Sequence, residues 1–152
     1  MKSMQEWVRE YYENGGYNCS ETIVHAGNSC YELGLHEEDM KLLAGFGGGM
    51  FVGSTCGALI GCVAVLSKLM IKTKAHDQMS EFRPVIQACH RNFRNLLGGT
   101  DCTQLKPVHH SKETRCLKTV LLAAQALEQT VIEFDLMKKQ NPEDSVTSPI
   151  SN

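Results

Sequence analysis

Residues 42–67 contain no charged side chain, and this stretch constrains the fold more than any other feature of the sequence. It is long enough for a membrane helix, which needs about 20 apolar residues, and Gly57 and Gly61 have the spacing of a helix-dimer face. However, the glycines at 47–49 interrupt the stretch, and each glycine costs a helix interior about 1 kcal/mol. The flanks also lack the aromatic and basic anchors of a membrane span. We therefore expect two short buried helices joined by a glycine-rich loop, and no membrane insertion.

Apolar residues recur with helical spacing along almost the whole chain, and no segment alternates as a strand would. Asn18 and Glu21 form a capping-box pair at the start of one such segment. These patterns predict an all-α, single-domain bundle of about five or six helices, with the glycine-rich loop before the fourth helix. The expected helices cover about residues 3–13, 18–34, 36–46, 56–72, 80–97 and 111–139.

Chain length and composition limit the domain organisation and the partners. With 152 residues, the chain can form one compact domain, expected at 1–140, followed by a disordered polar tail at 141–152. The net charge of −2 and the aromatic content of 7% argue against nucleic acid as a partner. Nucleic-acid binders carry basic surfaces and stacking aromatics instead.

The cysteine content is unusual for the expected compartment. The first ten residues are charged and amphipathic and lack the apolar core of a secretory signal, so a cytoplasmic location is expected. Thiols stay reduced in the cytoplasm, where structural disulfides are rare. The seven cysteines therefore indicate metal ligation or redox chemistry.

Three of the cysteines have the positions of core residues. Cys30, Cys62 and Cys89 each continue the apolar face of a predicted helix. A buried cysteine packs as a small hydrophobic residue. We therefore interpret these three as structural.

The other four cysteines have positions that favour chemistry. Cys19, Cys56 and Cys102 each lie where a loop meets a helix start. Free backbone N–H groups at a helix start stabilise a thiolate, which is the reactive and metal-binding form of cysteine. Cys116, in the first turns of the last predicted helix, faces inward and completes a four-thiolate set.

This arrangement resembles a family of proteins described as redox-active and labelled by its pattern, C…GCAxxG…C…C. The resemblance covers about residues 10–130. It rests on Cys19, the glycines at 47–49, the segment Cys56-Gly57-Ala58-Leu59-Ile60-Gly61, Cys102 and Cys116. This chain reads Cys-Gly-Ala where the label reads Gly-Cys-Ala. The chain is also similar to the non-haem domain of split-Soret cytochromes, which implies an iron–sulfur centre, but it has no C-x-x-C-H motif for covalent haem.

The first of three functional hypotheses is an electron-transfer protein with a metal centre. Four thiolates form the standard shell of an iron–sulfur cluster, and the metal ligands would be Cys19, Cys56, Cys102 and Cys116. The same four thiolates also suit structural zinc. An electron-transfer protein of this kind requires a redox partner protein.

The glycine-rich turn would form part of such a centre. Its backbone N–H groups can hydrogen-bond to cluster sulfurs and raise the reduction potential. The expected cofactor-binding glycines are Gly48, Gly49, Gly53 and Gly57.

The second and third hypotheses require no metal. In the second, Cys56 has a lowered pKa, attacks a disulfide and is resolved by one of the other three cysteines. In the third, the chain is a helical interaction module, and the apolar glycine-rich segment forms a homodimer surface. His109 and His110 offer a mixed-ligand variant of the first hypothesis, although such a pair is more often part of a solvated loop before a helix. The sequence leaves open whether the protein is an enzyme.

Overall fold

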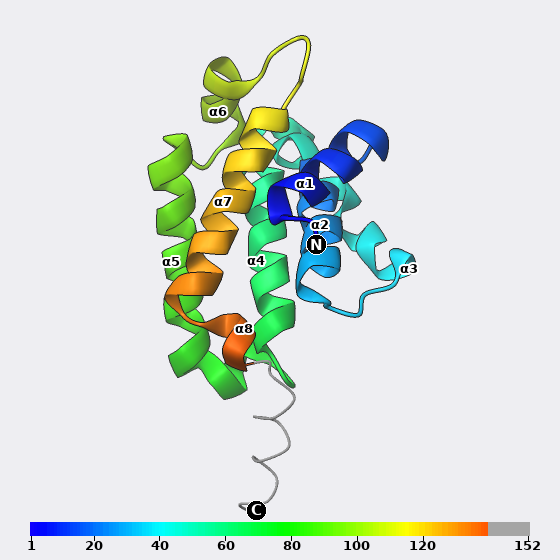
Figure 1. Ribbon diagram of the computed structural model, residues 1–152. Helices are drawn as coiled ribbons and strands as arrows, with labels where there is room; N and C mark the ends of the chain where they lie inside the picture. The colour runs from blue at the N-terminus through cyan, green and yellow to red at the C-terminus, as the bar shows by residue number, and fades with distance from the viewer. Residues whose placement is uncertain (140–152) are drawn as a thin grey trace, which may run out of the picture.

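The computed structural model describes residues 1–139, which form a bundle of helices with isolated bridges but no strand (Figure 1). Its α-helices are α1 (Met4–Arg9), α2 (Cys19–Tyr31), α3 (Glu37–Met40), α4 (Gly57–Met70), α5 (Met79–Leu97), α6 (Cys102–His109), α7 (Leu117–Glu133) and α8 (Leu136–Lys139). Turns of 3-10 or π type cover Glu10–Asn14, Lys41–Phe46, Gly49–Gly53 and Ala75–Gln78. The all-α prediction is confirmed, and the tail expected at 141–152 lies outside the described residues.

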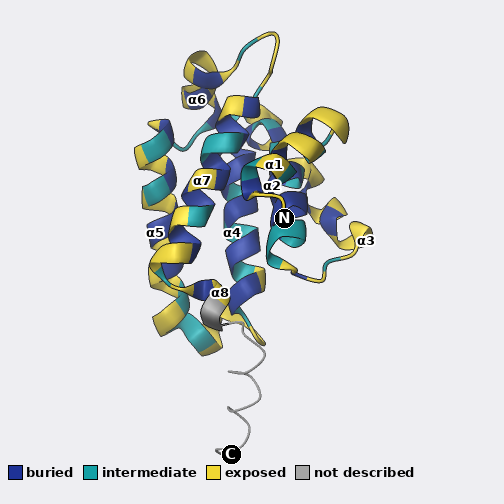
Figure 2. Ribbon diagram, viewed as in Figure 1, coloured by how far each residue is buried: buried dark blue, intermediate teal, exposed yellow. Residues whose placement is uncertain are grey.

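Helix α4, from the second half of the uncharged stretch, occupies the centre of the bundle. It packs against α2 on one side and against α5 and α7 on the other. Its side chains Cys62, Val65 and Leu66 are fully buried. Figure 2 shows α4 buried along most of its length, whereas α5 and α7 each expose one face. The absence of charge over residues 57–67 of α4 therefore reflects a helix surrounded by other helices.

Glycines allow α2 and α4 to approach closely. A Cβ atom on Gly61 would lie 2.8 Å from Cβ of Ile23, and one on Gly27 would lie 2.6 Å from a methyl carbon of Val65. Real Cβ atoms do not come this near, so larger residues would push the two helices apart. The Gly57-x-x-x-Gly61 spacing thus serves packing inside the bundle. No helix within residues 1–139 combines the length and apolar character needed to cross a membrane.

The last predicted helix differs most from the structure. The segment expected as one helix over 111–139 opens with a tight turn, in which Ser111 and Arg115 exchange two backbone hydrogen bonds of 3.0 and 2.7 Å. Arg115 has a left-handed φ of 55°, so α7 begins only at Leu117. Asp135, with φ of 52°, separates α7 from α8. The structure also contains α6, which begins at Cys102, where the sequence predicted a helix start without assigning a helix range.

Candidate redox site

The four cysteines expected to act together line one cavity, although they come from four separate elements. Cys19 and Cys102 are the first residues of α2 and α6, and Cys56 and Cys116 cap the N-termini of α4 and α7. The cavity has a volume of about 30 Å³. Its remaining walls come from Gly48, Gly57, Leu105, Lys106 and Thr119. Figure 1 shows α6 at the end of the bundle where α4 and α7 begin.

Two extended segments hold Cys56 and Cys102 beside each other. The backbone N–H of Cys56 donates to the Thr100 carbonyl at 2.8 Å, and that of Cys102 donates to the Ser54 carbonyl at 2.7 Å. Thr55 and Asp101 form an antiparallel bridge between these bonds. The short ladder fixes the starts of α4 and α6 relative to each other, so the two cysteines face one cavity.

A tyrosine from the N-terminal region positions Cys116. The backbone N–H of Cys116 donates to the hydroxyl oxygen of Tyr12 at 3.0 Å. The Arg115 guanidinium lies over the Tyr12 ring, 4.6 Å from its centroid. Tyr12 is buried, so it ties the start of α7 to the π-type turn that follows α1. No local sequence signal marks this contact, because Tyr12 and Cys116 are far apart in the chain.

Cys19 is the thiolate of the site. The Cys56 thiol donates a hydrogen bond to the Cys19 sulfur. The backbone N–H groups of Gly48 and Ser20 donate to the same sulfur. These donors outweigh the effect of burial and lower the pKa of Cys19 to about 6. The same hydrogen bond, together with burial, raises the pKa of Cys56 well above its ordinary value. The expectation that Cys56 has the lowered pKa is therefore wrong, because the two cysteines share one proton and it stays on Cys56.

The other two sulfurs of the cavity remain protonated thiols at neutral pH. Burial raises the pKa of Cys102 and, together with the negative charges of neighbouring cysteines, that of Cys116. Lys106 opposes both shifts through its positive charge. It follows Cys102 by four residues, so the two share one face of α6. The sequence patterns did not single out Lys106, because no helix range was assigned after the predicted helix start at Cys102.

The glycine-rich turn forms one wall of the site. Gly48 and Gly57 line the cavity, and a Cβ atom on Gly57 would lie 2.7 Å from the Cys19 sulfur. A Cβ atom on Gly49 would lie 2.9 Å from Cβ of Cys102. Gly53 does not line the cavity; its carbonyl accepts a hydrogen bond from the Thr103 hydroxyl at 2.5 Å and fixes the turn to α6.

The backbone of this turn is left-handed over several residues. Gly48 and Gly49 have φ of 60° and 63°, and the non-glycine residues Met50 and Phe51 follow with 59° and 61°. A left-handed conformation is costly for residues with a side chain and persists only where the surroundings enforce it. Here the Ser54 N–H bonds to the Gly49 carbonyl at 3.0 Å and closes the turn. The bend brings the Gly48 N–H to the Cys19 sulfur.

The remaining cysteines lie elsewhere, and none of the seven forms a disulfide. Cys62 and Cys89 are fully buried in the core, and Cys30 packs against it, half-buried. The predicted core positions of Cys62 and Cys89 are confirmed, whereas Cys30 lies at the edge of the core.

The histidine pair does not contribute to the cavity. Nε2 of His109 pairs with the Leu97 carbonyl at 2.8 Å, and the residue is buried. His110 is exposed at the end of α6. Neither histidine is among the residues that line the four-cysteine cavity. Across residues 1–139, no three or more His, Cys, Asp or Glu side chains have the geometry that holds a single metal ion.

Comparison with known proteins places the chain in a redox family. The family model described as "Putative redox-active protein (C_GCAxxG_C_C)" matches residues 17–130, which is most of the chain and includes all four cavity cysteines. The chain belongs to this family. No curated protein and no solved structure matches it.

Proposed function

We propose that this chain is an electron-transfer protein whose redox centre is the four-cysteine cavity, with an iron–sulfur cluster held by Cys19, Cys56, Cys102 and Cys116. The observation that carries the proposal is that four cysteines from four helix starts line one cavity. Thiol–disulfide exchange requires two cysteines, whereas four thiolates are the usual ligands of an iron–sulfur cluster. Membership of a redox family supports the same class of function.

The lining of the cavity fits this donor set. Gly57 leaves the Cys19 sulfur open, since a Cβ atom there would lie 2.7 Å from it. Gly48 directs a backbone N–H to the same sulfur, and Lys106 supplies positive charge against thiolates. When bound, a cluster supplies reversible one-electron transfer. Free thiols suit a reducing compartment such as the cytoplasm, and a one-electron carrier requires a redox partner protein.

Anaerobic reconstitution with iron and sulfide tests the proposal. The wild-type protein should bind iron and acid-labile sulfide and show visible absorbance. Serine variants at each of the four cavity cysteines should lose most of this iron, whereas Cys30→Ser should retain it because Cys30 lies outside the cavity. Circular dichroism of each variant checks that the bundle has folded.

Two results contradict the cluster. A wild-type protein without iron or sulfide after reconstitution excludes it. One equivalent of zinc, retained by the wild-type protein and lost from the cavity variants, would assign a structural zinc site instead.

A second candidate function is metal-free thiol–disulfide exchange, favoured by the proton that Cys19 and Cys56 share. The Cys19 thiolate would attack a substrate disulfide and release one thiolate. The Cys56 thiol, after losing its proton, would attack the Cys19 sulfur of the mixed disulfide and release the second substrate thiolate. The substrate disulfide is thereby reduced to two thiols, and Cys19 and Cys56 are oxidised to one disulfide.

Peptide mapping after oxidation tests this second function. Treatment of the metal-free protein with a small-molecule disulfide should give a Cys19–Cys56 bond, and Cys56→Ser should trap the mixed disulfide on Cys19. A mixed disulfide that forms first on Cys56 would contradict the assignment of Cys19 as the attacking thiolate.

A further inference from the structure

The glycine-rich turn presents three consecutive apolar side chains to solvent beside the four-cysteine cavity. Met50, Phe51 and Val52 are 44%, 76% and 79% exposed. A Cβ atom on Gly48 would lie 3.8 Å from Cδ1 of Phe51, and Gly48 lines the cavity. The Phe51 ring therefore lies on the turn that forms a wall of the proposed redox centre.

The backbone of this turn is strained at two of the three residues. Met50 and Phe51 both have left-handed φ, a conformation that is costly for residues with a side chain. Such strain is concentrated at functional sites, where the surroundings enforce it. Single exposed apolar side chains are ordinary on a protein surface, whereas contiguous ones with a charged rim mark interaction sites. The turn therefore has the character of a contact surface.

The charge next to this turn is positive. Lys106 of α6 lines the cavity, and α6 contacts the turn. Residues 101–118, which cover α6 and the start of α7, contain the exposed basic residues Lys106, Lys112, Arg115 and Lys118 and the acidic residues Asp101 and Glu113. None of the four basic residues forms an ion pair with a carboxylate in residues 1–139. This end of the bundle is therefore basic, although the chain has a net charge of −2.

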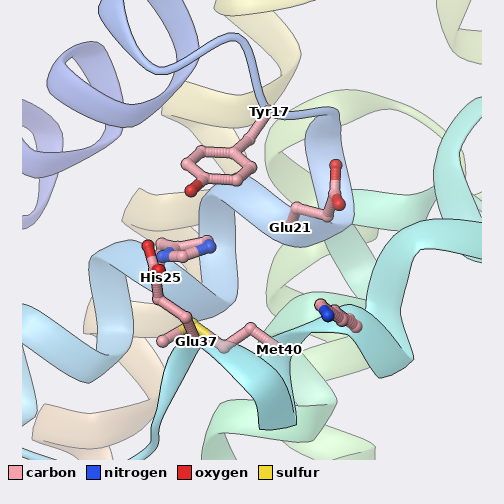
Figure 3. Close-up of a pocket in the computed structure, with 6 residues that line it drawn as sticks. Tyr17, Glu21, His25, Glu37 and Met40 are labelled. Carbon is pink, nitrogen blue, oxygen red and sulfur yellow. The ribbon is translucent and has the colours of Figure 1, made fainter.

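Part of the negative charge of the chain lies on another side. Glu21 and Glu37 line a pocket of about 160 Å³ between α2 and α3, and Figure 3 shows their side chains around it. Glu38 and Asp39 follow Glu37 on α3, and Lys41 is paired with Glu38 at 2.9 Å. Because α3 and α6 lie apart in Figure 1, the molecule has an acidic α3 side and a basic α6 end.

The charge decides which occupant fits the apolar turn. A second copy of the chain is disfavoured, because a symmetric dimer interface would bring the same basic residues of both copies together. An acidic protein is complementary, and opposite charges would steer its encounter with this end of the bundle. Contacts between electron-transfer proteins are small, so a short apolar patch with a charged rim is sufficient.

We infer that residues 50–52, together with Lys106 and the basic residues that follow it, form the docking surface for an acidic electron-transfer protein. The apolar side chains would contact an apolar patch of the partner, and the basic side chains would face carboxylates around that patch. The electron-transfer character of the partner rests on the function proposed above.

Binding of oxidised flavodoxin, an acidic protein with an exposed flavin edge, to the full-length chain tests this surface. Isothermal titration calorimetry at low salt should show saturable binding. Salt at about 0.3 M should weaken the affinity by about tenfold or more, because the charges are exposed and screened. Cytochrome c, a basic protein with an exposed haem edge, should not bind.

The experiment is run on the metal-free chain and again after reconstitution with iron and sulfide. Both forms should bind flavodoxin, since none of the surface residues is a proposed cluster ligand. Docking without iron uptake would contradict the cluster and support the surface. Iron uptake without docking would support the cluster and overturn the surface.

Variants separate the apolar part of the surface from the charged part. Phe51→Ser should weaken flavodoxin binding by about tenfold or more, as expected for loss of a central apolar anchor. Lys106→Gln should weaken it by about threefold and reduce its salt dependence. The matched controls are Ile132→Ser and Lys72→Gln, which change an exposed apolar residue and an exposed lysine at the other end of the bundle. Both controls should bind as the wild-type chain does.

Circular dichroism checks that each variant has folded, and Val52→Ser provides a second change within the apolar turn. Absence of flavodoxin binding at low salt, or equal binding of cytochrome c, would overturn the docking surface. Equal weakening by Ile132→Ser and Phe51→Ser would show that the apolar turn is not the contact. A wild-type chain that sediments as a dimer, with Phe51→Ser as a monomer, would assign the surface to a homodimer instead.

Discussion

Two pairs of neighbouring cysteines in this bundle are alike in chemistry and different in environment. In each pair one thiol donates to the other: Cys56 to Cys19 at the end of the bundle, and Cys62 to Cys89 in the core. The Cys62 thiol also lies 3.4 Å from the Ala123 carbonyl, an acceptor, and the Thr130 side chain hydrogen-bonds to Cys89. The Cys19 sulfur instead receives backbone N–H groups from a helix start and a glycine turn.

The difference teaches what separates a reactive cysteine pair from a structural one. Contact between two sulfurs lowers the pKa of one partner in both places. Only the Cys19–Cys56 pair combines that contact with a cavity and with further cysteines around it. The core pair is fully buried, so a reagent reaches it only when the bundle unfolds.

The largest expected difference is in alkylation rate. Iodoacetamide at neutral pH should modify Cys19 in the folded protein, because the pKa of Cys19 is about 6 and its side chain is only partly buried. Cys62 and Cys89 should react more slowly by about a thousandfold or more, because their exposure requires global unfolding. Mass spectrometry of peptides after timed quenching measures the rates. Comparable rates at Cys89 and Cys19 would remove the distinction between the two pairs.

A smaller effect, on stability, is expected when a methyl group is added at Gly57, where the backbone closely approaches the Cys19 sulfur. Gly57→Ala should lower the free energy of unfolding by about 1–3 kcal/mol, because its Cβ would lie 2.5 Å from the Phe46 carbonyl and 2.7 Å from the Cys19 sulfur. The matched control is Gly45→Ala, because no neighbouring atom lies within 4 Å of the position that its Cβ would take. Urea denaturation followed by circular dichroism measures both. If the two variants are equally stable, the close approach at Gly57 does not constrain the site.

The pH dependence of stability tests whether Cys19 is ionised in the folded protein. The folded pKa of Cys19, about 6, lies below the unfolded value of about 8.5, so the unfolded state holds more protons between these limits. The free energy of unfolding should therefore rise with pH across this window by up to about 1.4 kcal/mol per unit, and fall as pH drops through 6.

Cys19→Ser provides the control for this pH profile. The variant should flatten the rise between pH 6.5 and 8.5, a window that lies above the lowered pKa of His25. Urea denaturation at a series of pH values measures the slope. A wild-type slope that persists in Cys19→Ser would assign the titration to another group.

The smallest effect concerns the cation at the edge of the cavity. Lys106→Gln should raise the pKa of Cys102 and Cys116, because the lysine charge lowers both. The shift should be modest and should shrink in high salt, since Lys106 is exposed and its charge is screened. The pH dependence of Cys102 alkylation measures it, with Lys112→Gln as a control on another exposed lysine. An equal shift of the Cys102 pKa in both variants would indicate that the net charge of the protein, and not the position of Lys106, causes it.

Helical periodicity predicted the architecture well because it reflects local burial. The apolar stripes that place Cys62 and Cys89 in the core depend only on spacing along one helix, and the structure confirms them. The start of α7 was missed because it depends on the left-handed conformation of Arg115 and the turn that Ser111 closes. Neither residue type signals such a turn by itself.

The sequence predicted which cysteines form the site, but not which of them ionises. Helix-start positions singled out Cys19, Cys56 and Cys102, and the structure brings them together with Cys116. Which of them ionises was predicted wrongly. The answer depends on the direction of one S–H bond and on a Gly48 N–H that arrives from a distant segment.

The sequence by itself determined the all-α class, the break at the glycines and the division of the cysteines into two groups, because these follow from spacing and from the backbone chemistry of helix ends. Only the tertiary structure decided that Cys19 carries the negative charge and that Tyr12 and Lys106 belong to the site. Hydrogen bonds and charges act over a few ångströms in space. The residues that set a pKa are therefore those that folding brings near, whatever their distance along the chain.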